Sequence, residues 1–424
     1  MKAVYFDVAV IGGGPSGLAA ALAADNCGAK TLLIEREAEL GGILKQCVHD
    51  DFGLVRFGEK LTGPEYAHKF ICRIPESGVE TALFTFLSKV EKTRNDFELT
   101  LVNRDGVILA TCKTIVLACG CRERSSCQTG IHGGHPAGIF TAGTAQYYTN
   151  ILGKMPAKRC IILGSGDIGL IMARRLKLEG AEVLGVYEAK PAANCIARNI
   201  YQCLEYFDIP LFTSRTVTRV FGEERVTAVE ITSVDENMIP IPGTEEIIEC
   251  DALILSTGLI PENELAESLG IPIDARTKGP IIDQNYMTMI DGVFCCGNAL
   301  HVNDLVDYVS ESGEAAGRAA AGYVMANNAV NHRSFAEITA DDSLRYVVPG
   351  KVNVNALDEP TVVFFRSKTE MRMTRLTVTI NGNVTYRKIY PRIHPAEMER
   401  LELDFHKMNI ESGSTIRFSL SEVI

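Results

Sequence analysis

The sequence has no tryptophan, no CxxC pair and no run of 18 or more apolar residues in its 424 residues. The missing apolar run argues against a transmembrane helix. The net charge of −11 argues against a nucleic-acid partner, because phosphate binding requires a basic face. With 46% hydrophobic and 22% charged residues, the composition is that of a globular protein, and the length predicts two or three domains.

The thirteen cysteines are scattered and odd in number. Zinc and iron–sulfur sites need clustered thiolates at short fixed spacings, so we predict no metal site. The one apolar stretch near the N-terminus, residues 8–24, contains five glycine or proline residues between positions 12 and 17, which is unlike a secretory signal. We therefore expect a reducing cytoplasm, with any membrane association made through a partner.

A GxGxxG pattern follows the apolar strand pattern of residues 5–11 and opens an Ala/Leu-rich helix that is predicted to end near Asn26. In such a unit the first glycine makes the turn, the second lets the backbone approach a pyrophosphate, and the third allows close packing of helix on strand. The helix N-terminus attracts the phosphates, and an acid at the end of the next strand accepts hydrogen bonds from the ribose hydroxyls. The predicted dinucleotide site comprises Gly12, Gly14, Pro15, Ser16, Gly17 and Glu35.

The same pattern recurs in "RCIILGSGDIGLIMARRLKLEGAEVLGVYE", where the acid lies 24 residues after the first glycine. Two complete units in one chain predict two dinucleotides, one held tightly and one that exchanges. A carboxylate at position 188 favours NAD over NADP, although Lys190 lies close by. The second site comprises Gly164, Gly166, Asp167, Ile168, Gly169 and Glu188.

Three further motifs carry a resemblance to a known family. They are "TIVLACG" at 114–120, "DALILSTGLIPENEL" at 251–265 and "GVFCCGN" at 292–298. In this order they resemble the two-dinucleotide flavoproteins that include the pyridine nucleotide–disulfide oxidoreductases. The resemblance implies FAD in the first unit and NAD in the second. It adds Arg36, Gly41, Gly42, Val90, Ala118, Gly120, Arg124, Gly297, Asn298, Val306 and Asp307 to the FAD site, and Gly258 to the NAD site.

The chain departs from that family at two motif positions. Cys119 stands where the family has threonine, and Asn298 stands where it has aspartate. Asn298 keeps a side-chain acceptor without the charge, so FAD is still expected to bind. The helix predicted after it, from about Asp304, is expected to direct its first N–H groups at the flavin.

Within this family, "CGCRER", "PAGIFTAGTAQ" and "HVNDLVDYVSESGE" resemble a narrower branch. It includes flavoprotein subunits of opine, proline and sarcosine dehydrogenases, and NAD/FAD oxidoreductases associated with glycerol-3-phosphate dehydrogenase. That branch implies a second flavoprotein or a small cysteine-bearing protein as electron-transfer partner, and an oligomer.

The predicted fold is α/β, with an NAD-binding Rossmann-like domain at 151–251 inserted into an FAD-binding one at 1–150 and 252–330. Residues 335–424 alternate apolar and polar side chains around Asn381-Gly382, which predicts a β-hairpin in a small, mostly β domain. This domain carries no glycine-rich loop, so we assign it to partner contact or dimerisation.

Three functions are compatible with these patterns. In the first, FAD exchanges electrons between NAD(H) and a partner subunit or small acceptor. In the second, Cys47 in "LGGILKQCVHDD" is a redox sulfur, as in single-cysteine NADH peroxidases or coenzyme A-disulfide reductases. In the third, the chain is a nucleotide-binding scaffold or sensor without turnover. The first requires only the motifs that are present, and it is our prediction.

Overall fold

The computed structural model describes residues 4–326 and 333–423. The chain divides into two compact units, with residues 1–121 and 261–424 in unit 1 and residues 122–260 in unit 2. Unit 2 begins earlier and ends later than the predicted 151–251, because the segment after residue 121 supplies two strands and a helix to it. Among the described helices, none is long and apolar enough to span a membrane.

Unit 1 is built on a sheet whose strand order is β3-β2-β1-β6-β5-β4, with β18 paired to β6. β3, β2, β1, β6 and β18 pair in parallel, whereas β4 and β5 form an antiparallel meander with β6. A hairpin at Asp105-Gly106 joins β5 to β6. The strands are β1 (Val4–Ile11), β2 (Thr31–Ile34), β3 (Glu80–Ala82), β4 (Phe86–Lys92), β5 (Phe97–Asn103), β6 (Gly106–Leu117) and β18 (Val293–Cys295).

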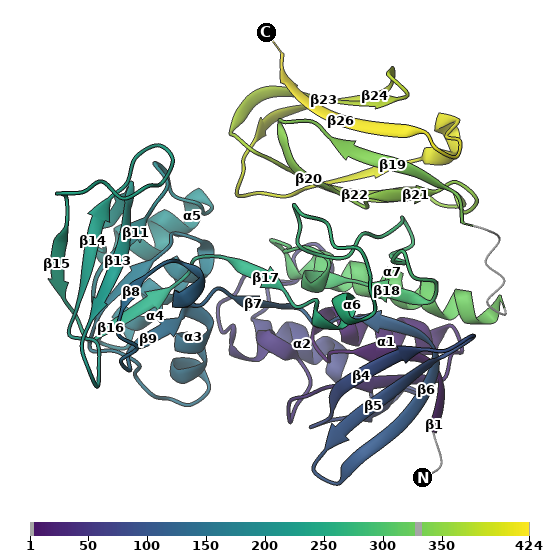
Figure 1. The fold of residues 1–424 in the computed structure, drawn as a ribbon, viewed down its shortest axis with the longest axis horizontal. Helices are drawn as coiled ribbons and strands as arrows, with labels where there is room; N and C mark the ends of the chain where they lie inside the picture. The colour runs from purple at the N-terminus through teal and green to yellow at the C-terminus, as the bar shows by residue number, and fades with distance from the viewer. Residues whose placement is uncertain (1–3, 327–332, 424) are drawn as a thin grey trace. The chain divides into compact units, whose positions relative to one another are not determined.

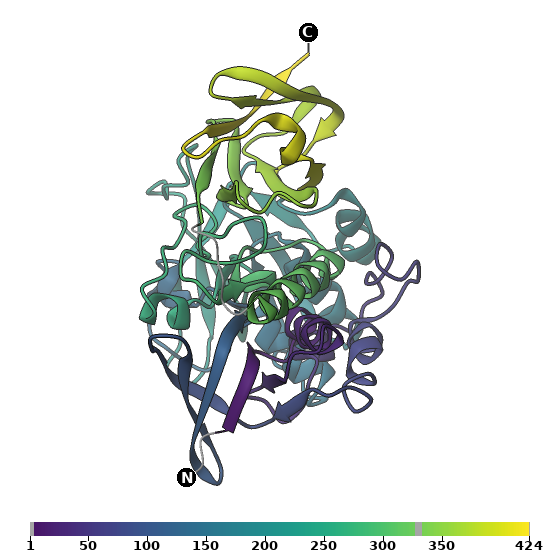
Figure 2. The ribbon, with the colours of Figure 1, turned by 90° about the vertical axis from the view of Figure 1, so that its right-hand side faces the viewer.

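Two helices of unit 1, α1 (Pro15–Asn26) and α7 (Val306–Met325), lie side by side against this sheet (Figures 1 and 2). A Cβ atom on Gly313 would lie 2.1 Å from the Ser16 carbonyl oxygen, and one on Gly317 would lie 2.1 Å from that of Ala20. Only glycine permits so close an approach. Both contacts advance by four residues, so α1 and α7 run parallel. The other helices of the unit are α2 (Gly63–Ile71) and α6 (Glu264–Ser268).

Unit 2 repeats the parallel design with the strand order β12-β11-β10-β16-β9, and an antiparallel group, β15-β14-β13, pairs with β8. Its strands are β8 (His132–Gly133), β9 (Ile139–Thr141), β10 (Arg159–Leu163), β11 (Glu182–Glu188), β12 (Leu211–Thr213), β13 (Arg215–Phe221), β14 (Ala228–Ser233), β15 (Glu246–Glu249) and β16 (Ala252–Leu255). Its helices are α3 (Ala142–Asn150), α4 (Asp167–Leu178) and α5 (Ala197–Asn199). The chain leaves unit 1 along β7 (Cys121–Glu123) and returns along β17 (Leu259–Pro261), and these two strands pair.

The described part of the C-terminal module, residues 333–423, forms two sheets, with strand orders β21-β19-β26-β23-β24 and β20-β22-β25. Apolar side chains from both sheets, including Phe365, Val378 and Phe418, form one buried cluster. The predicted hairpin at Asn381-Gly382 joins β23 to β24. The strands are β19 (Phe335–Ala340), β20 (Leu344–Val348), β21 (Lys351–Asn353), β22 (Thr361–Ser367), β23 (Met371–Ile380), β24 (Asn383–Ile393), β25 (Glu399–Leu403) and β26 (Thr415–Glu422).

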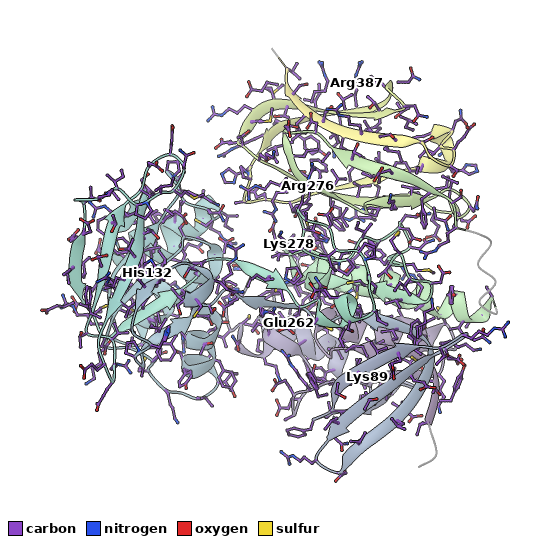
Figure 3. All side chains as sticks on the ribbon, viewed as in Figure 1. Lys89, His132, Glu262, Arg276, Lys278 and Arg387 are labelled. Carbon is purple, nitrogen blue, oxygen red and sulfur yellow. The ribbon has the colours of Figure 1, made fainter. Side chains whose placement is uncertain are left out.

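The three-stranded sheet of the C-terminal module contacts the start of α7, whereas β23 and β24 lie on the side away from it (Figure 1). The imidazole of His301 lies between the rings of Tyr346 and Phe364, with ring centroids 5.8 and 5.4 Å away. Arg276, labelled in Figure 3, adds a contact through its guanidinium to the carbonyl oxygen of Ala340. The module therefore packs on the first unit's own core elements and belongs to unit 1.

Burial of His301 predicts an acid-sensitive stability. The side chain is 1% exposed, and neither ring nitrogen has a hydrogen-bond partner among the described residues. Burial, together with the nearby Arg366, lowers its pKa to about 3. The folded-state pKa lies below the unfolded value of about 6.5, so the stability that the neutral ring contributes is complete above pH 6.5 and is lost as the pH falls toward 3.

We expect the free energy of unfolding to be about 2 kcal/mol lower at pH 5 than at pH 7 from this residue alone. His301→Leu is expected to remove that difference and to unfold no more easily than the parent at pH 7, because it deletes two unsatisfied buried nitrogens. Urea unfolding of the parent and the variant at pH 5 and pH 7 measures the change in the free energy of unfolding. An equal pH dependence in parent and variant would show that His301 is not the titrating group.

Candidate dinucleotide sites

The first glycine-rich loop joins β1 to α1 in a turn that leaves no room for a Cβ atom at its first and last glycines. Gly12 has a φ of +107°, and a Cβ atom on Gly17 would lie 1.7 Å from the Gly12 carbonyl oxygen. α1 starts at Pro15, and no described side chain caps it. Its first-turn N–H groups are therefore available to an anionic ligand at the loop.

Glu35, at the end of β2, lies next to this loop. Its carboxylate is 6% exposed and accepts hydrogen bonds from the backbone N–H groups of Gly13 at 2.7 Å and Glu37 at 2.8 Å. The neighbouring Arg36 donates to Glu262, labelled in Figure 3, at 3.4 Å. Glu35 is thus fixed beside the loop, and its predicted role toward a ribose stays a prediction.

The second glycine-rich loop, in unit 2, has the same construction. Gly164 has a φ of +102°, and a Cβ atom on Gly169 would lie 2.7 Å from the Gly164 carbonyl oxygen. Glu188, 7% exposed, accepts hydrogen bonds from Ser165 through its N–H at 3.0 Å and its hydroxyl at 2.6 Å, and from the Lys190 N–H at 2.9 Å. Each unit therefore holds a buried carboxylate against the second residue of its glycine loop.

Several polar groups of the second loop were missed from the sequence. The Ser165 hydroxyl also accepts the Asn194 N–H at 2.9 Å, and the Asp167 carboxylate accepts the Asn199 amide at 2.6 Å. Asp167, Gly166 and Ile168 lie at the start of α4, as predicted, but the Asp167 carboxylate is bonded to the segment after β11. Serine inside a glycine loop was the one available signal for Ser165.

Gly41 and Gly42, two of the residues predicted for the FAD site, lie against the first loop. The Gly41 N–H donates to the Gly13 carbonyl oxygen at 2.9 Å, and a Cβ atom on Gly42 would lie 2.9 Å from the Gly14 Cα atom. Residues 42–46 then form a 3₁₀ turn that ends at Cys47. The chain thus passes the loop closely enough to cover a bound pyrophosphate.

Cys47 has the environment of a neutral thiol. Its Sγ atom donates to the Ile43 carbonyl oxygen at 3.4 Å, and burial raises its pKa to about 12. A nucleophilic cysteine needs a lowered pKa, so this environment argues against a thiolate there. The single-thiol role stays a prediction.

We therefore expect Cys47→Ser to leave NADH-dependent reduction of an artificial dye within about twofold of the parent, since the substitution exchanges one sulfur atom for oxygen in a neutral side chain that is not needed for electron transfer to the dye. Cys72, exposed on the same unit, provides the control Cys72→Ser. Under the redox-thiol account, Cys47→Ser alone would instead abolish turnover of a disulfide or peroxide substrate.

Ala118, Gly120, Gly297 and Asn298 come together at the ends of β6 and β18. A Cβ atom on Gly12 would lie 2.4 Å from the Ala118 carbonyl oxygen, and one on Gly297 would lie 2.6 Å from the Ser16 hydroxyl. The Asn298 side-chain oxygen accepts the backbone N–H of Asn303 at 3.0 Å, and its side-chain NH₂ group donates to the Cys121 sulfur at 3.6 Å. The sequence did not indicate Cys121.

Val306 and Asp307 lie in the first turn of α7, which no described side chain caps. The Asp307 carboxylate accepts the Arg56 N–H at 3.0 Å, and the Val306 carbonyl oxygen accepts the Tyr66 hydroxyl at 3.4 Å. These two residues therefore hold the loop and α2 against α7. Any contact with a cofactor would be made by the helix N–H groups.

Two further predicted FAD residues lie in β4 and after β7. Val90 is buried within β4 opposite Leu99, and its role toward FAD stays a prediction. The Ala82 carbonyl oxygen, at the end of β3, accepts the Glu35 N–H at 2.9 Å. Arg124 belongs to unit 2, where its N–H donates to the Gly258 carbonyl oxygen at 3.1 Å.

The residues present fit two dinucleotides. Both glycine loops are tight enough to exclude a Cβ atom at their first and third glycines. By contrast, Gly14, the second glycine of the first loop, has no described non-neighbouring atom closer than 4.0 Å to its Cβ position, and Gly166 of the second loop has only the Ser256 hydroxyl, at 3.7 Å. The loops are thus closed toward the protein and open on the side where phosphates would lie.

Known proteins are similar to most of this chain. A family model described as pyridine nucleotide-disulphide oxidoreductase matches residues 6–330. An opine oxidase subunit of Agrobacterium tumefaciens is 23% identical over 75% of this chain and 65% of its own length. An alkyl hydroperoxide reductase subunit of Staphylococcus aureus is 24% identical over 69% of this chain and 54% of its own length. The chain therefore spans less than two thirds of either relative.

Among solved structures, the thioredoxin reductase of T. acidophilum has the same fold, with a TM-score of 0.62 at 21% identity. The similarity covers 76% of this chain and 99% of the reductase. The family model ends at residue 330, before the C-terminal module begins.

Proposed function

Because the chain belongs to the pyridine nucleotide-disulphide oxidoreductase family, we propose that it is a FAD-dependent oxidoreductase that exchanges electrons between NAD(H) and a partner protein or small acceptor. The observation that carries this proposal is the pair of equivalent loops, each with a buried carboxylate bonded to the loop's second residue. One loop lies in each unit. Two dinucleotides in one chain are what such electron exchange requires.

FAD, when bound, would supply the hydride and electron chemistry, and the chain's own residues would hold and orient it. The first-turn N–H groups of α1 would bind the pyrophosphate, and Glu35 would accept the ribose hydroxyls. Asn298 and the start of α7 lie on the β6 side of β1, opposite to Glu35 at β2. A dinucleotide that crosses the loop from Glu35 would therefore extend its flavin half toward Asn298 and α7.

Glu188 supports NAD as the exchanging nucleotide. Its carboxylate is fixed by Ser165 and Lys190, and a fixed negative charge accepts the 2′-hydroxyl of NAD and repels the 2′-phosphate of NADP. The Lys190 ammonium is bonded to the Asn194 side chain at 2.9 Å, which reduces its availability to a phosphate.

The partner is proposed from the relatives. The opine oxidase and alkyl hydroperoxide reductase relatives are both named as subunits of their enzymes. We infer a second flavoprotein or a small cysteine-bearing protein as the electron-transfer partner here, in a glycerol-3-phosphate or amino-acid dehydrogenase system.

Steady-state reduction of an artificial dye tests the proposal. The purified chain should be yellow and should reduce the dye with NADH at least about tenfold more efficiently than with NADPH, a preference of about 1.4 kcal/mol. A colourless chain, or one that turns over with neither nucleotide, would leave only the scaffold alternative. A preference for NADPH would contradict the role of Glu188.

A further inference from the structure

Two arginines of the C-terminal module form ion pairs with carboxylates at the start of α7. Arg366, on β22, donates to the Asp304 carboxylate at 2.5 Å, and the Met398 N–H donates to its other oxygen at 2.6 Å. Arg400, on β25, makes two bonds to Glu311 at 2.6 and 3.1 Å. Asp304 lies just before the helix and Glu311 lies in its second turn.

The face of α7 that the module contacts is opposite to its glycine face. His301 and Tyr308 pack on Phe364 of the module, between the two arginine contacts. Gly313 and Gly317 lie against α1. The helix is therefore held between α1, which carries the first glycine loop, and the C-terminal module.

The parallel packing of the two helices locates the start of α7 relative to the loop. Gly313 is level with Ser16 at the start of α1. Val306 precedes Gly313 by seven residues, which at 1.5 Å per residue places the start of α7 roughly 10 Å beyond the start of α1. The first turn of α7 and the Arg366–Asp304 pair thus lie past the pyrophosphate position, at the end expected to hold the flavin.

We propose that Arg366 and Asp304 form a positioning pair that fixes the charge and the orientation of the α7 N-terminus toward the flavin, and that this is a function of the C-terminal module. The inference rests on the proposed binding of FAD at the first loop. Arg366 is itself fixed, because it also donates to the Tyr346 hydroxyl at 3.1 Å and to the Pro395 carbonyl oxygen at 3.1 Å. Its side chain is 12% exposed, whereas that of Asp304 is 34% exposed.

The charges of the pair predict opposite effects of removing each member. A positive charge near a flavin stabilises its reduced, anionic form and raises the midpoint potential. Arg366→Met leaves the Asp304 carboxylate without its counter-charge, so the potential should fall. Asp304→Asn leaves the Arg366 guanidinium without its counter-charge, so the potential should rise. The double variant should return close to the parent.

The matched control uses the second arginine. Arg400→Met also removes an arginine contact between the module and α7, but its partner Glu311 lies seven residues further along the chain, roughly 10 Å from Asp304 along the helix. It should lower the thermal stability to a similar extent and leave the potential unchanged. Arg366→Lys, which keeps the charge, should retain the parent potential.

The experiment is redox titration of the full-length, FAD-loaded protein against a reference dye, followed at the flavin absorbance. Opposite shifts in the two single variants, cancellation in the double variant and no shift in Arg400→Met support the pair. Shifts of the same sign, or no shift while FAD stays bound, would overturn it. If Arg366→Met does not fold, the isosteric variant Asp304→Asn still tests the pair, because its midpoint potential must rise. A parent that binds no FAD would refute the proposed function itself, which distinguishes that failure from failure of the pair.

Discussion

Gly17→Ala is expected to give a protein that binds FAD about 100-fold more weakly and purifies without yellow colour. The added Cβ atom would lie 1.7 Å from the backbone oxygen of Gly12, and neither atom belongs to a flexible side chain. The loop must therefore open, which displaces the first turn of α1 from the phosphates. Overpacking of this kind costs roughly 1–3 kcal/mol and sometimes more, and about 1.4 kcal/mol corresponds to tenfold in affinity.

Gly322→Ala is the control for this variant. Gly322 lies inside α7, and no described non-neighbouring atom lies within 4 Å of its Cβ position. Alanine in a helix interior is favoured over glycine by roughly 0.5–1 kcal/mol, so this variant should keep FAD and melt slightly higher. The measurement is the FAD content after gel filtration, together with the melting temperature. Full FAD content in Gly17→Ala would show that the first loop does not hold the cofactor.

The second large effect is expected from Gly164→Ala, which should keep FAD and lose reduction by NADH. A Cβ atom at Gly164 would lie 2.1 Å from the Ser256 carbonyl oxygen, at a φ of +102°. Both the contact and the positive φ oppose a side chain. The distortion stays within unit 2, since Gly164 and Ser256 both belong to it. We expect the rate of flavin reduction at limiting NADH to fall about 10- to 100-fold.

Gly180→Ala is the control for Gly164→Ala, because it introduces backbone strain in unit 2 without changing the second glycine loop. Gly180 follows α4 in the same unit with a φ of +95°, and its Cβ position has no described non-neighbouring atom within 4 Å. It should lose stability, by about 1 kcal/mol, and keep the parent rate in rapid-mixing measurements with NADH. If both variants slowed equally, general destabilisation of unit 2 would explain the result, and the second loop would not be the NADH site.

Much of the two sites could be predicted because their signals are local. The end of α1 at Asn26 and the placement of Glu35 and Glu188 follow from glycine spacing and strand pattern within about thirty residues. The family that the motifs indicated is the one whose model matches residues 6–330.

What could not be predicted depends on distant pairing. Unit 2 starts at residue 122 because β8 and β9, with only two and three residues, pair with strands about eighty or more residues later. The contact of Arg366 with Asp304 joins residues 62 apart in the sequence. No local sequence pattern predicts such a contact, so the ion pairs between the module and α7 are visible only in the structure.

Anaerobic titration of the purified chain with NADH, followed at the flavin absorbance, tests the central claim most directly. If FAD and NAD occupy the two loops and exchange electrons, the absorbance should bleach fully with about one equivalent of NADH per FAD, since each transfers two electrons. A flavin that stays oxidised with excess NADH, or a chain that carries no flavin, would contradict the account.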